Sequence, residues 1–407
     1  MNDAPRDDFD ALVRRLFSYG FRPLFLCTVG AAIFLIAWWV GVWFALVPAP
    51  VPTMNPVAWH GHEMLFGMVG SAIGGFLLTA VANWTRRPPV SGLPLALIVG
   101  TWLLARLVFA YDFDLSPIER ALVDVSYWIL LAAYMANEVI RGRSYRNIGI
   151  VGVLTVFALL CGFFHFDAIF GTTLGSALIS LHATVFLVCI LISVIGGRII
   201  PAFTGNWLRL REGPDTRLPT PFNWVDRSAI LSTIAAGAAW TLAANAMVTS
   251  ALLLACGCLH IVRMLRWRGH RTLSEPLLFV LHVGYAWLGI GILFLAASAN
   301  NIVPASTGIH ALSVGAMTGL IVAVSSRAAM GHTNRAPASD RLLTTSFVLI
   351  NLAAIARVAA SMADTNWLLL AGSLWCLAFV AFAIRVAPIL TGPPASRESL
   401  LSRGPRG

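Results

Sequence analysis

The chain consists largely of apolar stretches that are long enough to cross a lipid bilayer, separated by short polar loops. A membrane-spanning helix needs about 17–25 mostly apolar residues, and a helix satisfies its own backbone hydrogen bonds inside lipid. The sequence therefore predicts an all-α polytopic membrane protein with about twelve transmembrane helices. The predicted spans are residues 23–47, 61–82, 93–111, 121–140, 147–165, 172–199, 228–247, 249–266, 275–297, 307–330, 343–361 and 366–389.

Composition supports lipid as the solvent of this chain. Of the 407 residues, 58% are hydrophobic and 11% are charged, and the mean hydropathy is +0.79. A soluble domain of this length could not bury so much apolar surface in one core. The formal net charge is +10, but the basic residues stand singly or in small groups between apolar runs, so they fit topology signals and exclude nucleic-acid binding. The cysteines lack C-x-x-C spacing, which argues against a zinc module.

The arginines define a topology. They concentrate in alternate loops, while the loops between are nearly free of them, so the positive-inside rule predicts an even number of spans with both termini in the cytoplasm. We therefore expect a cytoplasmic amphipathic segment at residues 1–22, a single transmembrane domain at 23–390, and a disordered cytoplasmic tail at 391–407. The arginine-bearing loops contain Arg86 and Arg87, Arg141 to Arg146, Arg198 to Arg227, Arg263 to Arg271, and Arg327 to Arg341.

Three histidines recur at an interval of four predicted helices. His62, His182 and His310 lie on the second, sixth and tenth spans, and each precedes a helix end that carries asparagine or arginine. This spacing favours three four-helix repeats around a pseudo-threefold axis. The alternative is that helix ends in any membrane protein collect histidine, asparagine and arginine. Under the repeat hypothesis the three histidines enter the outer half of the bundle from three sides.

Ionisable side chains inside a bilayer are costly unless they are paired or bound to a ligand, so the intramembrane histidines are candidates for function. His60, His62 and Glu63 place two imidazoles and a carboxylate at the start of the second span, and imidazole suits copper, iron and zinc. On a regular helix His60 and His62 point about 200° apart. Either the helix begins between them, or His62 faces inward and His60 meets the interface. The outer group also contains His165, His182 and His310.

A second group lies in the inner half of the predicted bundle. His260 follows Cys256 by four residues, so the two share a helix face, and with Cys258 they form a candidate site for a soft metal such as Cu(I). The alternative is a buried cysteine beside a hydrogen-bonded histidine. His282 and His332 belong to the same half.

Two predicted outer-side arginines have two interpretations. Arg106 and Asp124 fall at similar depth on adjacent helices, which favours mutual neutralisation. Alternatively, Arg106 and Arg357 face the propionates of a heme, since guanidinium binds carboxylate in a bidentate manner. Glycines of the second span either allow close helix packing or leave room for a flat macrocycle; they are Gly67, Gly70, Gly74 and Gly75.

Several short motifs, taken in order, resemble the NnrS family over nearly the whole chain. They are Gly20-Phe21-Arg22-Pro23, the segment Trp59 to Gly67, the segment Gly75 to Thr85, Gly197-Arg198 with Pro201 to Asn206, and Gly331-His332-Thr333. The resemblance implies a heme- and copper-containing bacterial inner-membrane protein of the nitric oxide response, associated with denitrification and with resistance to nitrosative stress. It implies metal binding at His60, His62, Glu63 and His332, to which the repeat adds His182 and His310. Asn334 departs from the glycine expected there.

Twelve helices in three four-helix units also resemble the catalytic subunit of heme-copper oxidases and nitric oxide reductases, although fold does not determine function. By this analogy His62 and His310 form an axial heme pair, and His182 is a copper ligand. The seventh span lacks the further copper histidines of the oxidases, so oxygen reduction is not expected.

These observations leave competing functions. The first is a heme and copper protein in the lipid bilayer that binds or turns over nitric oxide, with nitric oxide or small iron–nitrosyl species as its partners. The alternative is a secondary transporter of a metal, heme or an iron–nitrosyl complex, for which twelve spans and repeats are equally normal. A sensor or assembly factor is a third class. The sequence indicates no catalytic residue and no oligomeric state.

Overall fold

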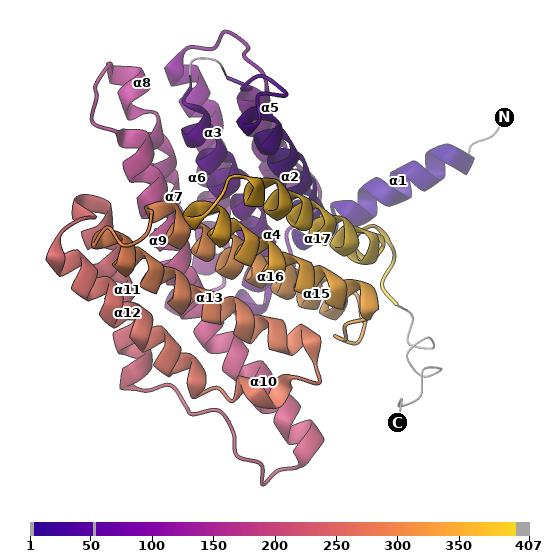
Figure 1. The fold of residues 1–407 in the computed structure, drawn as a ribbon. Coiled ribbons are helices and arrows are strands. Elements are labelled where there is room, and N and C mark those ends of the chain that lie inside the picture. Colours follow the sequence, from indigo (N-terminus) through magenta and orange to yellow (C-terminus); the bar gives the residue numbers. More distant parts are fainter. Residues whose placement is uncertain (1–3, 52–53, 396–407) are drawn as a thin grey trace. The chain divides into compact units, whose positions relative to one another are not determined.

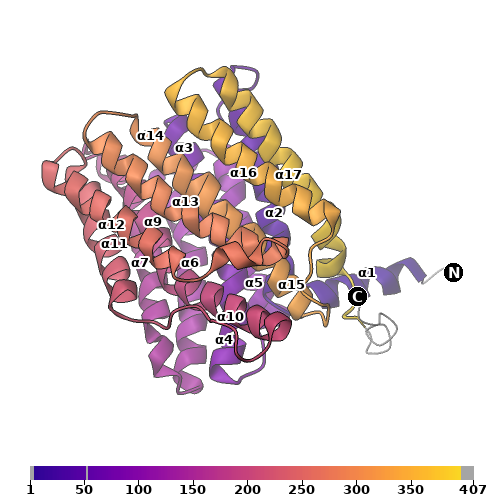
Figure 2. The same cartoon turned by 60° about the horizontal axis from the view of Figure 1, so that its bottom comes forward.

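The computed structural model describes residues 4–51 and 54–395, and every element within these ranges is a helix. The predicted all-α polytopic class is confirmed (Figures 1 and 2). Eleven helical runs in the described part are long and apolar enough to cross a membrane. They are α2 (Phe21–Trp43), α3 with η1 and α4 (Pro56–Thr85), α5 (Gly92–Ala110), α6 (Pro117–Arg141), η2 with α7 (Tyr145–Phe164), α9 with η3 and α10 (Ser176–Glu212), α12 (Met247–Leu265), α13 (Pro276–Ala299), α14 with η5 and α15 (Ala305–Gly331), α16 (Arg341–Met362) and α17 (Asn366–Thr391).

One predicted span differs from these eleven. The segment predicted at 228–247 forms helix α11 (Trp224–Ala243), but its first turn carries Asp226 and Arg227, and it is not among the eleven apolar runs. The total of twelve spans therefore stays a prediction, as do the inner-membrane location and the cytoplasmic termini. Short helices complete the described chain: α1 (Ala4–Leu16), α8 (Phe166–Phe170) and η4 (Gly269–Thr272).

The helices group into two compact units. Unit 1 contains the described residues of Met1–Leu181, Ser325–Pro337 and Phe382–Gly407, and unit 2 contains His182–Val324 and Ala338–Ala381. The expected single transmembrane domain at 23–390 stays a prediction. The expected amphipathic segment contains helix α1 of unit 1, whereas the expected tail falls mostly outside the described residues.

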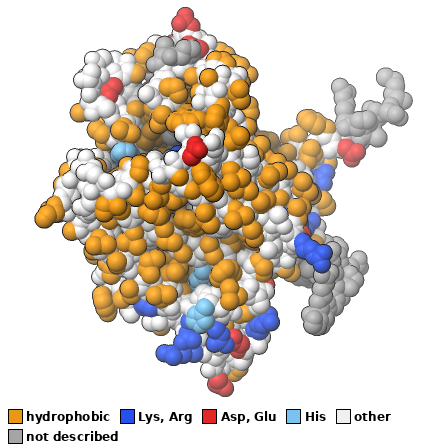
Figure 3. All heavy atoms as spheres, in the orientation of Figure 1, with side chains coloured by type: hydrophobic (Ala, Val, Ile, Leu, Met, Phe, Trp, Pro, Cys, Tyr) orange, Lys and Arg blue, Asp and Glu red, His pale blue; other side chains and the backbone are white. Residues whose placement is uncertain are grey.

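Large apolar side chains are exposed along the spans, as lipid-facing positions require. Examples are Leu97 on α5, Leu122 on α6 and Leu159 on α7. Figure 3 shows hydrophobic side chains over most of the face that it draws. Many apolar helices with apolar outer faces fit a multi-pass membrane protein.

In unit 1 the glycines of the second span bring neighbouring helices close together. A Cβ at Gly75 would lie 2.8 Å from the ring of Phe25 on α2, so only glycine fits that contact. Of the two sequence interpretations, close helix packing is the one seen here. Each glycine has a side chain from another helix against it: Arg106 at Gly67, Trp128 at Gly70, Tyr127 at Gly74 and Phe25 at Gly75.

Three helical runs contain a π-helical segment. Segment η1 (Glu63–Val69) begins directly after His62, and η5 (Ala311–Thr318) begins directly after His310. The third, η3 (Ile192–Gly196), lies further along the run that contains His182. Such segments are rare in proteins, and those that occur are often located at functional sites. His62 and His310 are thus each followed directly by a π-helical segment, while the four-helix repeat itself stays a prediction.

The start of α6 is fixed by its own sequence. Ser116 accepts a hydrogen bond from the Glu119 backbone N–H, and the Glu119 carboxylate accepts one from the Ser116 N–H at 2.9 Å. Pro117 occupies the first helical position, where its missing N–H costs nothing. Because this capping box defines where α6 begins, it also sets the position of Asp124 two turns later.

Candidate metal centre

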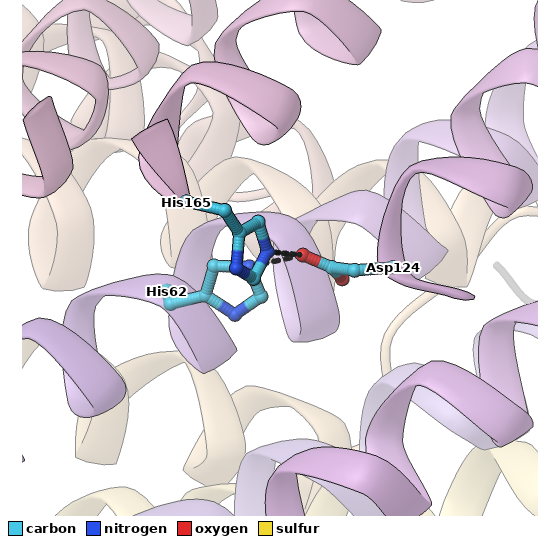
Figure 4. A group of neighbouring side chains, drawn as sticks. All are labelled: His62, Asp124 and His165. Carbon is cyan, nitrogen blue, oxygen red and sulfur yellow. Dashed lines mark hydrogen bonds and ion pairs between the residues drawn. The ribbon is translucent and has the colours of Figure 1, made fainter. Parts of the chain in front are cut away.

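Three buried side chains of unit 1 meet at one point (Figure 4). The Asp124 Oδ2 atom of α6 lies 2.7 Å from His62 Nε2 and 3.1 Å from His165 Nε2. The two imidazoles approach the carboxylate from different elements, since His62 ends α3 and His165 joins α7 to α8. All three residues are at most 3% exposed. Each offers one ligand atom, and these atoms lie within 4.8 Å of one another, so the group could hold a metal ion.

The local chain explains why these side chains face inward. Helix α7 (Ile148–Phe164) ends just before His165, whose backbone N–H bonds to the Gly162 carbonyl as a helix end requires. The His62 ring stacks on Phe109 of α5, with centroids 4.1 Å apart and planes 9° apart, and Phe164 lies against it at 4.5 Å. Aromatic side chains thus shield the centre from water and lipid.

An arginine and a second carboxylate complete the centre. Arg106 Nη2 donates to Asp124 Oδ1 at 3.0 Å, which confirms the predicted neutralisation of this pair. Arg106 Nη1 also contacts Glu63, whose Oε1 lies 3.1 Å from His62 Nδ1. Two carboxylates therefore face one guanidinium. Because an unbalanced buried charge is costly, the centre favours additional positive charge, which a proton on His62 or a metal ion would supply.

The donors suit a transition metal. Two imidazole Nε2 atoms and a carboxylate oxygen are ligands for copper, zinc or iron. The Nδ1 of His62 faces Glu63, and a carboxylate on that nitrogen orients the ring and leaves Nε2 for the metal. Glu63, predicted as a metal ligand, thus contacts the ring nitrogen of His62 that does not face Asp124.

The other predicted residues of unit 1 lie elsewhere within it. His60 stacks on Trp39, with centroids 4.4 Å apart and planes 10° apart. It faces away from the buried His62, which matches the second of the two orientations expected from the sequence. His332 packs against Tyr19 and Phe21, at 5.2 Å and 5.7 Å, and burial lowers its pKa. The structure brings neither imidazole into the group of His62, Asp124 and His165.

The predicted residues of unit 2 have local partners. His182 packs against Trp240, with centroids 4.2 Å apart. His310 Nδ1 donates to the Ser306 carbonyl at 2.7 Å. Arg357 donates to Ser361 one turn along its own helix. Because each unit is described by itself, the axial pair of His62 with His310, the copper role of His182 and the propionate roles of the arginines stay predictions.

The inner group is a hydrogen-bonded network in unit 2. Thr233 donates to the Ala229 carbonyl, so its oxygen accepts from His260 Nε2 at 2.8 Å, and His260 Nδ1 accepts from the Tyr285 hydroxyl at 2.8 Å. Cys256 lies 3.6 Å from the Thr233 hydroxyl, whereas Cys258 is exposed. This arrangement matches the alternative of a buried cysteine beside a hydrogen-bonded histidine. His282 similarly contacts Thr204 at 2.9 Å.

The role of His165 was missed by the sequence reasoning, and Asp124 was interpreted only as the partner of Arg106. His165 stands at a predicted helix end, where interfacial histidines are common. The sequence offered one indication, the depth of the residues in the membrane, because the predicted topology places His165 and His62 both at the outer side. Helix ends do not reveal which side chain turns inward, so the convergence of the two imidazoles required the tertiary structure.

Comparison with known proteins identifies a family. A family model described as NnrS protein matches residues 15–393, which is nearly the whole chain. No curated protein matches the sequence. The family model spans every residue of the candidate metal centre. The match to this family and the buried group of His62, Asp124 and His165 together suggest metal binding.

Proposed function

Because the chain belongs to the NnrS family, and is thereby a membrane protein related to the nitric oxide response, we propose that it is a metalloprotein that binds nitric oxide. His62, His165 and Asp124 would hold a transition metal ion such as copper, and the bound metal would supply the binding of nitric oxide. The observation that supports this proposal is the convergence of two buried imidazoles on one carboxylate inside the membrane spans.

The surrounding residues have separate roles in this proposal. Glu63 accepts a hydrogen bond from Nδ1 of His62 and so holds the ring in the orientation that presents Nε2. Arg106 contacts both carboxylates and neutralises one of the two negative charges, and Phe109 and Phe164 exclude water. Nitric oxide is a small apolar gas that partitions into lipid, so a centre enclosed by aromatic side chains within the spans stays accessible to it.

Heme is the second cofactor of the proposal, and we assign it to unit 2. A porphyrin on Nε2 of His62 would occupy the space in which Asp124 and His165 lie. We therefore do not propose His62 as a heme ligand. His310 is better suited. Its Nδ1 donates to the Ser306 carbonyl, which places the acceptor lone pair on Nε2, as in histidine ligands of heme. Helix α16, which carries Arg357, packs against α14, which ends at His310, so Arg357 and His310 lie on neighbouring helices.

The metal centre predicts different results for two neighbouring histidines. We expect protein purified from membranes to contain a transition metal, and His62→Ala to lower its metal affinity by more than about 10- to 100-fold. His60→Ala, which removes a ring stacked on Trp39, should retain the metal. Elemental analysis and electron paramagnetic resonance, with and without nitric oxide, measure both. Absence of metal from the wild-type protein, or equal losses in the two variants, would contradict the metal centre.

The heme assignment has its own test. We expect a Soret band in the purified protein, its loss in His310→Ala, and its retention in His62→Ala. The optical spectrum of each variant, normalised to protein, measures this. If His62→Ala loses the band and His310→Ala keeps it, heme belongs to unit 1. Metal- or heme-dependent uptake into proteoliposomes would instead support the transporter alternative.

A further inference from the structure

A cavity of about 930 Å³ lies in unit 2, between helix α10 (Gly197–Glu212) and the loop that joins α10 to α11 (Figure 1). Arg198, Asn206 and Arg209 of the helix line it with polar groups. Leu218 and Phe222 of the loop line it with apolar surface. Much of the helical wall comes from the fourth of the family motifs noted in the sequence, which neither the metal centre nor the heme assignment uses.

The two walls of the cavity are set by local structure. Positions 198, 202, 205 and 209 of α10 follow one another at intervals of four, three and four residues, so they share one face of the helix. The loop on the other side is attached to Arg266, at the end of α12. Arg266 Nη2 donates to the Pro221 carbonyl at 3.1 Å, and the Arg266 carbonyl accepts from the Thr220 N–H at 3.1 Å. Both arginines of the helical wall therefore face a bounded space.

The acidic side chains near the cavity already have cationic partners. Asp226 pairs with both Arg263 and Arg266, at 2.8 Å and 3.1 Å, so it neutralises only one of these two guanidiniums. Glu212 pairs with Arg271 at 2.8 Å. Within the described residues, the two arginines that line the cavity take part in no ion pair. The cavity is consequently an electropositive site that lacks a counter-ion from the chain.

A third guanidinium lies directly behind the helical wall. A Cβ at Gly197 would clash with the guanidinium of Arg263, so only glycine fits between this arginine and the cavity that Gly197 lines. Arg263 is fully buried, and its Nη2 has no hydrogen-bond partner among the described residues. The field of this group adds to the attraction of an anion into the cavity.

Helix length and aromatic residues place the cavity at the membrane surface. The helical run Ser176–Glu212 contains 37 residues, whereas about 20 residues cross the hydrocarbon core of a bilayer. The end of α10 must therefore extend beyond that core. Phe222 and Trp224, which lie between the cavity and the body of α11, are exposed, and tryptophan is enriched at the boundary between membrane and water. The cavity thus falls at the level of lipid headgroups.

We propose that this cavity binds the headgroup phosphate of an anionic phospholipid. Arg198 and Arg209 contact the phosphate oxygens, since guanidinium forms strong charge-assisted hydrogen bonds with phosphate. Leu218 and Phe222 contact the glycerol and the upper acyl chains, a role for which a free phosphate offers no matching surface. Basic pockets at the ends of membrane helices bind such headgroups. The site lies in unit 2 and does not depend on the metal centre.

Native mass spectrometry of the full-length protein, titrated with phosphatidylglycerol or with phosphatidylcholine of the same acyl chains, tests this site. We expect the wild-type protein to prefer phosphatidylglycerol. The double variant Arg198→Gln with Arg209→Gln should bind it roughly 30-fold more weakly, because each arginine near the surface contributes about fivefold. Arg217→Gln with Arg227→Gln removes the same charge from exposed arginines outside the cavity and should keep the preference.

A third variant separates the shape of the cavity from its charge. Ala202 is exposed on the cavity-lining face of α10, so Ala202→Phe places a ring in the cavity and leaves both arginines in place. It should also weaken phosphatidylglycerol binding, and phosphatidylcholine binding should stay unchanged in every variant. Equal affinities in the two double variants would show attraction to the whole surface and overturn the proposal. Displacement of the lipid by soluble glycerol phosphate at equal affinity would overturn it in favour of a free phosphate ester.

Discussion

Replacing Arg106 by methionine is expected to lower the free energy of unfolding by about 3–5 kcal/mol, because removal of one partner leaves buried charges uncompensated. Arg106 contacts both Glu63 and Asp124, and these two carboxylates are at most 2% exposed. Methionine retains much of the volume but no charge. The two carboxylates would then face each other's repulsion across a centre with no guanidinium. Unfolding of the purified protein in mixed micelles with increasing denaturant measures the effect.

A matched control in unit 1 separates burial from charge. Arg87 pairs with Glu138 at 2.6 Å, but its side chain is 34% exposed, so Arg87→Met should destabilise the protein far less than Arg106→Met. The double variant Arg106→Met with Glu63→Gln should recover part of the loss, since one of the two stranded charges is removed. An Arg106→Met variant as stable as Arg87→Met would show that the two carboxylates are not both charged in the folded protein.

The Arg106 pair illustrates what sequence can predict in a membrane protein. Apolar run lengths place each residue at an approximate depth, and charges at equal depth on adjacent helices have few partners other than each other. That argument favoured the pairing of Arg106 with Asp124, whereas for His60 and His62 the helix period left two arrangements open, of which an inward-facing His62 is the one observed. Membrane depth alone was sufficient for Arg106 and Asp124 because both lie on predicted spans of ordinary length.

Depth was not sufficient for the rest of the centre. His165 follows the last residue of α7, where rotation about the helix axis decides which side chains turn inward, and the apolar pattern of that helix has no clear polar face. The π-helical segment after His62 was equally invisible, since one extra residue in a turn leaves no compositional mark. Such a turn also rotates every later side chain of the span, so positions counted from a regular helix become misplaced beyond it.

Replacing Arg263 by methionine in unit 2 is the second large expected effect, a loss of about 3 kcal/mol or more in the free energy of unfolding. Arg263 is fully buried. Its Nε donates to Asp226 at 2.8 Å, and its Nη1 donates to the Ser193 carbonyl at 2.7 Å and to the Tyr285 hydroxyl at 2.9 Å. In the variant all three groups lose the hydrogen bond from Arg263. Denaturant unfolding in micelles measures the loss, with Arg271→Met, at an exposed pair with Glu212, as the control.

A neighbouring arginine determines how large the Arg263 effect becomes. Arg266 Nη1 also contacts Asp226, at 3.1 Å, so this carboxylate keeps one cation when Arg263 is replaced. The single variant therefore sits near the lower end of the range for a broken buried pair, and Arg266→Met alone should cost about 1 kcal/mol. The double variant leaves Asp226 without either partner and should lose more than the sum of the single losses. Additive losses would mean that Asp226 does not couple the two arginines, and that the Ser193 and Tyr285 contacts carry the effect.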